Sequence, residues 1–158
     1  MFNINEVFEI AEQIERNGYA FYQKAAQIAK EESSKKFLLD LASMEMDHEK
    51  LFIEMKKKFT DNNISSPMDC DNIALSYLQA MVDGEVFSNI KPTDELLSGD
   101  ESVEDIRKIA IDFEKNTVVY FISLKNALNA ADDKQKIENL VNEEIRHIKI
   151  LTEWNPGA

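Results

Sequence analysis

Both histidines of this 158-residue chain stand three positions after a glutamate, and that spacing could place metal ligands together. The two pairs are Glu45 with His48 and Glu144 with His147. A single glutamate precedes each pair at the same interval of 30 residues, and these are Glu15 and Glu114. Residues i and i+3 share one face of a helix, so each pair can present an oxygen and a nitrogen ligand to one point.

This ligand set is typical of a carboxylate-bridged dinuclear metal site in a four-helix bundle. Such a site takes one glutamate from each of two helices and a Glu-x-x-His pair from each of the other two. Burying one unpaired carboxylate costs several kcal/mol, whereas a domain is stable by only about 5–15 kcal/mol. Four carboxylates balance two divalent ions, and mixed oxygen and imidazole ligands suit iron or manganese. We therefore expect two iron ions, with manganese as the alternative; in the metal-free alternative, the glutamates are solvated.

The elements that must position these side chains read as two helical hairpins. In the first, at about residues 5–60, apolar residues recur every three or four positions along two helices. Glu15 takes a place in the apolar stripe of the first helix, predicted over about 5–29. Glu45 and His48 do the same in the second, predicted over about 35–60. All three ligands are thus expected on the buried face.

The second hairpin repeats this pattern at about residues 102–154. Its first helix, predicted to run to about residue 129, opens with a capping-box-like sequence and carries Glu114 on its apolar line. A turn and cap predicted at 132–135 lead into a helix that carries Glu144 and His147 on its core face. The chain therefore reads as two copies of one hairpin.

About forty residues, 61–101, connect the hairpins. They contain several turn signals and a short helical stretch predicted at about 72–82. This length suits a crossover along a bundle, which makes the flanking helices parallel. We expect an all-α, single-domain fold over residues 1–158. The one cysteine, Cys70, rules out an internal disulfide and is expected to be a reduced bystander.

Composition excludes several classes of partner. The net charge of −12 and pI near 4.6 leave no cationic surface for nucleic acid or for anionic membranes. No apolar stretch approaches the roughly 20 residues needed to span a bilayer, and no basic segment leads into an apolar run at the N-terminus. The expected location is the cytoplasm.

Four sequence motifs resemble the rubrerythrin-like branch of the ferritin-like di-iron carboxylate proteins, over nearly the whole chain from Glu9 to Trp154. They are Glu15-Arg16-Asn17-Gly18-Tyr19-Ala20-Phe21-Tyr22, Glu45-x-x-His48, Phe113-Glu114-Lys115 and Glu144-x-x-His147. The resemblance implies that Glu45 and Glu144 bridge two irons, that Glu15 and Glu114 are terminal ligands, and that His48 and His147 each bind one iron. Tyr22 matches a family tyrosine beside the cluster, where it could hydrogen-bond a ligand; the sequence alone fits ordinary core equally well.

Two departures from the family qualify this resemblance. Rubrerythrins carry a second glutamate three residues after the ligand that Glu114 matches, and here Thr117 takes that place. This puts in doubt a peroxidase mechanism in which an iron switches ligands. The chain also lacks the two Cys-x-x-Cys knuckles of a rubredoxin-like domain, so electrons must come from a separate donor, such as a rubredoxin-like protein.

Three functions are open at this stage. The first is a di-iron oxidoreductase that reduces hydrogen peroxide or dioxygen, in the context of oxidative stress. The second is a ferroxidase or iron-handling protein without peroxidase turnover. The third is a metal-free or structurally metallated helical interaction module. A homodimer is expected, because hairpins of this kind commonly leave apolar surface to share.

Overall fold

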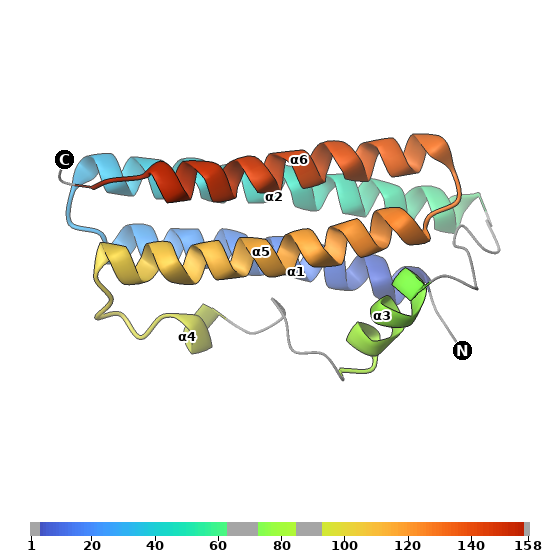
Figure 1. Cartoon of the computed structure of the whole chain (residues 1–158), viewed down its shortest axis with the longest axis horizontal. Helices are drawn as coiled ribbons and strands as arrows, with labels where there is room; N and C mark the ends of the chain where they lie inside the picture. The colour runs from blue at the N-terminus through green and yellow to red at the C-terminus, as the bar shows by residue number, and fades with distance from the viewer. Residues whose placement is uncertain (1–3, 63–72, 85–92, 157–158) are drawn as a thin grey trace.

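A computed structural model describes residues 4–62, 73–84 and 93–156 of the chain (Figure 1). The described segments form six helices: α1 Ile4–Ile28, α2 Glu32–Asp61, α3 Ile73–Val82, α4 Thr93–Leu96, α5 Val103–Ala127 and α6 Ala131–Glu153. None of these helices contains a stretch long and apolar enough to cross a membrane.

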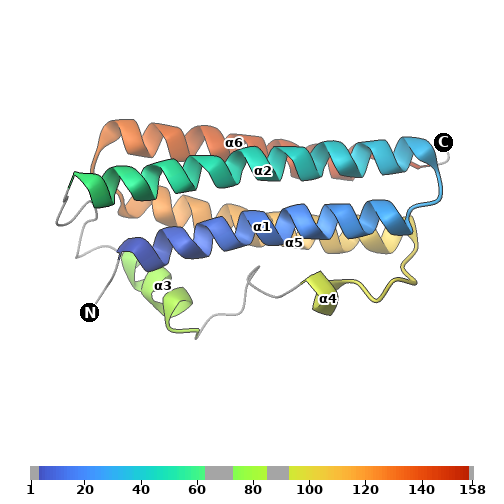
Figure 2. The ribbon, with the colours of Figure 1, turned by 180° about the vertical axis from the view of Figure 1, so that it is seen from behind.

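The four long helices form two antiparallel hairpins packed side by side (Figures 1 and 2). The first hairpin is α1 with α2, and the second is α5 with α6. In both views α2 lies beside α6 and α1 lies beside α5, and α2 runs parallel to α5. The predicted all-α bundle of two antiparallel hairpins, with a crossover between them, is confirmed.

Local sequence explains where α5 begins. Ser102 accepts a hydrogen bond from the Asp105 backbone N–H at 3.1 Å, and the Asp105 carboxylate accepts one from the Ser102 N–H at 3.1 Å. This reciprocal capping box satisfies two N–H groups that a helix start otherwise leaves free. It confirms the predicted start of the second hairpin.

Two helices begin earlier than their sequences suggest. Helix α2 starts at Glu32 rather than near Lys35, and α6 starts at Ala131, so the predicted turn at 132–135 is helical. Neither helix has a side-chain cap. Tertiary contact decides the start of α6 instead, because the buried Asp133 carboxylate lies 2.9 Å from the Lys58 ammonium at the end of α2. An acidic residue in the first turn also interacts favourably with the helix dipole.

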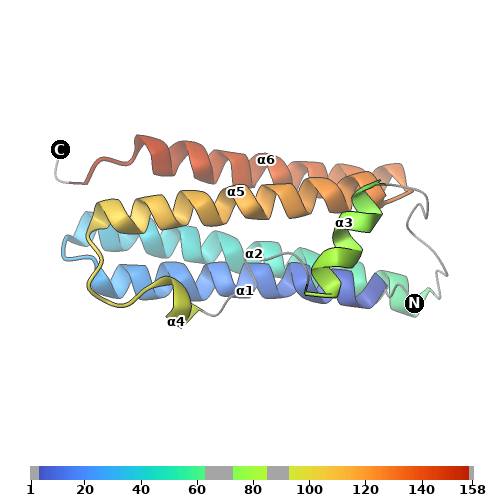
Figure 3. The same cartoon turned by 60° about the horizontal axis from the view of Figure 1, so that its bottom comes forward.

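The connection between the hairpins contributes two short helices, α3 and α4, on the side of the bundle formed by α1 and α5 (Figure 3). Helix α3 falls within the predicted 72–82, and its Leu78 and Met81 are buried in the core. Helix α4 was not predicted, since four residues are too few to show a helical period. Cys70 lies outside the described residues.

A polar layer divides the apolar core. Along each long helix an apolar stretch is followed by candidate ligands and then by a second apolar stretch. Phe8, Phe52 and Phe121 belong to the apolar cluster on one side, and Phe21 and Leu38 belong to the cluster on the other. The ligands therefore lie inside the bundle, with hydrophobic packing on both sides.

Candidate metal centre

The structure brings all six candidate ligands into this polar layer. The four glutamates are fully buried, and His48 and His147 are only 5% and 2% exposed. They form two groups whose ligand atoms lie within 4.8 Å of one another. We call these groups the His48 half-site (Glu15, Glu45, His48 and Glu144) and the His147 half-site (Glu45, Glu114, Glu144 and His147). Glu45 and Glu144 belong to both.

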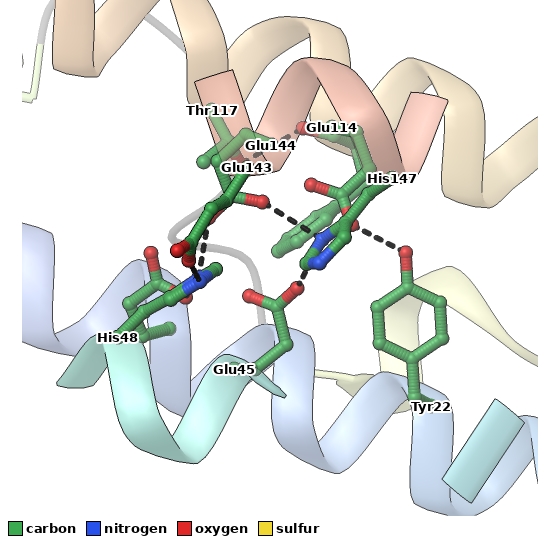
Figure 4. Close-up of polar contacts among 10 residues, drawn as sticks. Tyr22, Glu45, His48, Glu114, Thr117, Glu143, Glu144 and His147 are labelled. Atoms are coloured by element: carbon green, nitrogen blue, oxygen red, sulfur yellow. Dashed lines mark hydrogen bonds and ion pairs between the residues drawn. The ribbon is translucent and has the colours of Figure 1, made fainter. Parts of the chain in front are cut away.

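Helix geometry explains this convergence. Each Glu-x-x-His pair lies on one inward face of α2 or α6, and these two helices run side by side (Figure 4). Glu15 comes from α1 and Glu114 from α5. One glutamate from each of two helices and one pair from each of the others therefore meet at the same level of the bundle.

In the His48 half-site, the imidazole is held from both sides. Its Nδ1 atom lies 2.9 Å from Glu144 Oε1 and 3.5 Å from Glu15 Oε2. Its Nε2 atom lies 2.6 Å from Glu143 Oε2, on a side chain that is 50% exposed. A carboxylate on the outer nitrogen fixes the orientation of a ligating histidine and raises its basicity. Sequence reasoning missed Glu143, because this residue lies outside the apolar stripe of α6.

In the His147 half-site, the imidazole faces three carboxylates. Its Nδ1 atom lies 3.0 Å from Glu144 Oε2, 3.2 Å from Glu45 Oε1 and 3.4 Å from Glu114 Oε1. Burial alone would lower the pKa of His147, but the contacts with Glu114, Glu144 and Glu45 outweigh burial and raise it. The same balance, with Glu144 as the main partner, raises the pKa of His48.

Tyr22 holds the Glu114 carboxylate of the His147 half-site. Its hydroxyl donates a hydrogen bond of 2.5 Å to Glu114 Oε1 (Figure 4). Burial and then the charge of Glu114 raise the pKa of Tyr22 well above its usual value, so the phenol keeps the proton that it donates. One turn of α5 beyond Phe113, the buried Thr117 hydroxyl donates to the Phe113 carbonyl at 3.0 Å.

The carboxylates leave several buried oxygens without a hydrogen-bond partner among the described residues. These are both oxygens of Glu15 and of Glu45, Oε2 of Glu114 and Oε2 of Glu144. Burial, followed by repulsion from neighbouring carboxylates, raises the pKa of Glu15 and of Glu114 well above the usual value. Burial would also raise the pKa of Glu144, but its contacts with His147 and His48 lower it.

Divalent cations would account both for the buried oxygens that lack hydrogen-bond partners and for the crowding of the carboxylates. They would supply partners for the orphaned oxygens and would neutralise four carboxylates in a nearly anhydrous layer. The donor set of hard oxygens and imidazole nitrogens matches iron or manganese. The residues present therefore fit a dinuclear metal centre.

The histidines mark the side of the cluster that lies nearest to solvent. Two surface cavities of about 300 and 320 Å³ are both lined by Asp47, His48 and Glu143, and the first also reaches His147. A larger cavity of about 550 Å³ contains none of the six ligands, because it lies between the α1–α2 turn and the start of α5. These two cavities therefore offer small molecules an approach to the histidine side of the cluster, between α2 and α6.

Comparison with known proteins agrees with this fold. Residues 6–73, which include Glu15, Glu45 and His48, match the Rubrerythrin family. A crystal structure from Thermotoga maritima, described as a ferritin-like diiron-carboxylate protein, superposes with a TM-score of 0.76 at 22% sequence identity. The similarity covers 96% of this chain and 93% of that one. No curated protein shows significant sequence similarity to the chain.

Proposed function

We propose that the chain is a rubrerythrin-like member of the ferritin-like superfamily and that its buried cluster binds two iron ions that reduce hydrogen peroxide or dioxygen. The observation that carries this proposal is the convergence of four buried glutamates and two histidines, with several carboxylate oxygens that have no hydrogen-bond partner among the described residues. A structural role for these side chains does not account for burying so much like charge together.

The chain's own residues prepare the ions for this chemistry. Ferrous ions bound here would supply the electrons that reduce the oxidant. Glu45 and Glu144 lie in both half-sites, so they are the side chains that would be shared by the two ions. Tyr22 engages Oε1 of Glu114 and leaves Oε2 without a partner among the described residues, which makes Oε2 the oxygen available for a metal.

The remaining residues control access and protonation. The apolar clusters on both sides of the polar layer exclude bulk water, which strengthens every electrostatic interaction inside. The cavities beside His48 and Glu143 offer an approach for an oxidant as small as peroxide. The Tyr22 phenol, whose pKa is raised, stays protonated and so keeps a hydrogen-bond donor on Glu114 at the edge of the cluster.

A separate protein is proposed to return electrons to the cluster. The sequence contains one cysteine, which is too few for a rubredoxin-like iron site within this chain. A rubredoxin-like donor is the proposed partner.

Peroxide turnover in the presence of an electron donor tests this function. Protein loaded with Fe(II) without air should consume many equivalents of peroxide when a reduced rubredoxin is supplied. The matched control is the Glu45→Ala, Glu144→Ala double variant, which should consume none beyond its free iron. Oxidation of Fe(II) for a single cycle, with no further peroxide loss when reductant is present, would contradict the proposal and favour the ferroxidase alternative.

A further inference from the structure

Gly18 lies in the interior of α1, where its backbone conformation does not require a glycine. The glycines with positive φ in the described residues are Gly84 at 75° and Gly99 at 112°, and both follow or precede helices. Gly18 has the ordinary backbone of a helix of 25 residues, and glycine weakens a helix interior relative to alanine. Another cause must therefore account for a glycine at this position.

Steric contact with Glu45 supplies that cause. A Cβ atom built on Gly18 would lie 3.0 Å from Glu45 Oε2, 3.2 Å from Glu45 Cδ and 3.2 Å from Glu45 Cγ. The nearest three atoms all belong to this one side chain. A Cβ atom at position 18 would therefore push the Glu45 carboxylate away by a few tenths of an ångström.

Displacing Glu45 would disturb both half-sites of the candidate metal centre. It belongs to both half-sites, and its Oε1 atom lies 3.2 Å from His147 Nδ1 on the opposite helix. Its Oε2 atom faces Gly18 on α1. The carboxylate thus lies between the backbone of α1 and the imidazole of α6, with no spare room on the α1 side.

We infer that Gly18 is a positioning residue for Glu45: because it has no Cβ, it leaves the space in which the shared carboxylate reaches both metal ions. Glu15 and Gly18 lie one turn apart on the same face of α1. Helix α1 therefore provides the candidate ligand Glu15 and, one turn later at Gly18, the space for Glu45 of α2. This inference rests on the proposed function, because it concerns a carboxylate placed for two metals.

Gly18→Ala should leave the metal-free protein at least as stable as the natural chain, but it should weaken metal binding. Without metal, the far end of Glu45 can swing away, and alanine favours the helix, so the thermal unfolding midpoint should not fall. With metal, the carboxylate must return to the position that the new methyl group occupies. Affinity for metal should then drop about tenfold or more, as it does when groups that hold a ligand in place are removed.

A double-variant cycle with Co(II) as the probe tests this inference. Co(II) affinity by chelator competition and the visible absorption of bound Co(II) are measured for the natural chain, Gly18→Ala, Glu45→Ala and the combined variant. We expect Gly18→Ala to weaken binding and change the Co(II) spectrum, and to have no further effect when Glu45 is already alanine. Unchanged affinity and spectrum, or an equal loss in both backgrounds, would overturn the inference.

Stability of the metal-free proteins separates this inference from the proposed function. Gly18→Ala should raise the unfolding midpoint more in the Glu45→Ala background than in the natural chain, because only the natural chain has a carboxylate to displace. Equal shifts would contradict the steric contact itself. A natural chain that binds no Co(II) and no Fe(II) would instead contradict the proposed function, while this stability cycle would still report on Gly18.

Discussion

The two half-sites use the same ligand types but are supported in opposite ways. In the His48 half-site, the histidine is held from outside by Glu143, whereas neither oxygen of Glu15 has a hydrogen-bond partner among the described residues. In the His147 half-site, the carboxylate of Glu114 is held by Tyr22, whereas the acidic side chains that contact His147 among the described residues are all cluster carboxylates at Nδ1. One half-site has a fixed imidazole and the other has a fixed carboxylate.

This difference arises where the repeated hairpin pattern stops. The six ligands follow the two-fold repeat in sequence, but Glu143 and Tyr22 do not. The residue before Glu144 is Glu143, whereas the residue before Glu45 is Met44, which cannot accept a hydrogen bond from His147 in the same way. The two metal positions should therefore differ in affinity and in their response to substitution.

The largest effect is expected from the shared carboxylates. Glu144→Ala should weaken the binding of both ions, because Glu144 contributes to both half-sites, whereas Glu15→Ala and Glu114→Ala should each weaken the binding of one ion. Metal content after Fe(II) loading without air measures this. Loss of one ion in all three variants would show that the half-sites do not share Glu144.

The next largest effect should separate the two half-sites. Glu143→Ala removes the carboxylate on His48 Nε2 and should weaken one metal position about 10- to 100-fold, leaving the other close to its natural affinity. Stepwise titration with Fe(II) in the absence of air measures the two positions. Glu138→Ala is the matched control, because Glu138 is an exposed acidic residue on the same helix. Equal weakening of both positions would contradict the assignment of Glu143 to the His48 half-site.

Tyr22→Phe should produce a smaller effect, confined to the His147 half-site. The change leaves Glu114 Oε1 without its donor inside the bundle and should destabilise the metal-loaded protein by about 1–3 kcal/mol. Chemical denaturation of the loaded protein measures this. Tyr19→Phe, on the same helix, serves as the control because the Tyr19 hydroxyl bonds to Gln23 rather than to a ligand. An equal loss in both variants would count against a specific role for Tyr22.

The smallest predicted effect is the pH dependence of the metal-free protein. The raised pKa values of Glu15 and Glu114 mean that the folded chain binds more protons than the unfolded chain above the ordinary value of 4.5, so stability should fall as pH rises. The raised pKa of His48 acts in the same direction, because its stabilising protonated form is lost on raising the pH above the ordinary 6.5.

Denaturation of metal-free protein from about pH 5 to about pH 8 measures this slope. Metal should reverse it, because binding requires deprotonated ligands and therefore strengthens as pH rises. Glu144 acts in the opposite direction. Because its pKa is lowered, its stabilising contribution should be lost only as pH falls below the ordinary 4.5. Stability that rises with pH in the metal-free protein would contradict the crowding of carboxylates in the two half-sites.

The sequence predicts that the six candidate ligands face the core because they follow a helical period, and the structure buries them there. Glu15, Glu45 and Glu114 each replace an apolar residue in a buried stripe, and the structure buries all three completely. Glu143 escapes this reasoning because it lies outside the stripe and touches His48 only through the packing of α6 against α2. The reason for Gly18 is likewise visible only when the distance between two helices is known. The start of α6 depends on the long-range Asp133–Lys58 contact, and no local signal shows it.

Counting the Fe(II) ions that one chain binds in the absence of air tests the central claim most directly. The account predicts two ions per chain, bound with two distinguishable affinities, and none in the Glu45→Ala, Glu144→Ala double variant. A natural chain that binds no Fe(II), or a double variant that binds as much as the natural chain, would contradict a dinuclear centre between the two hairpins.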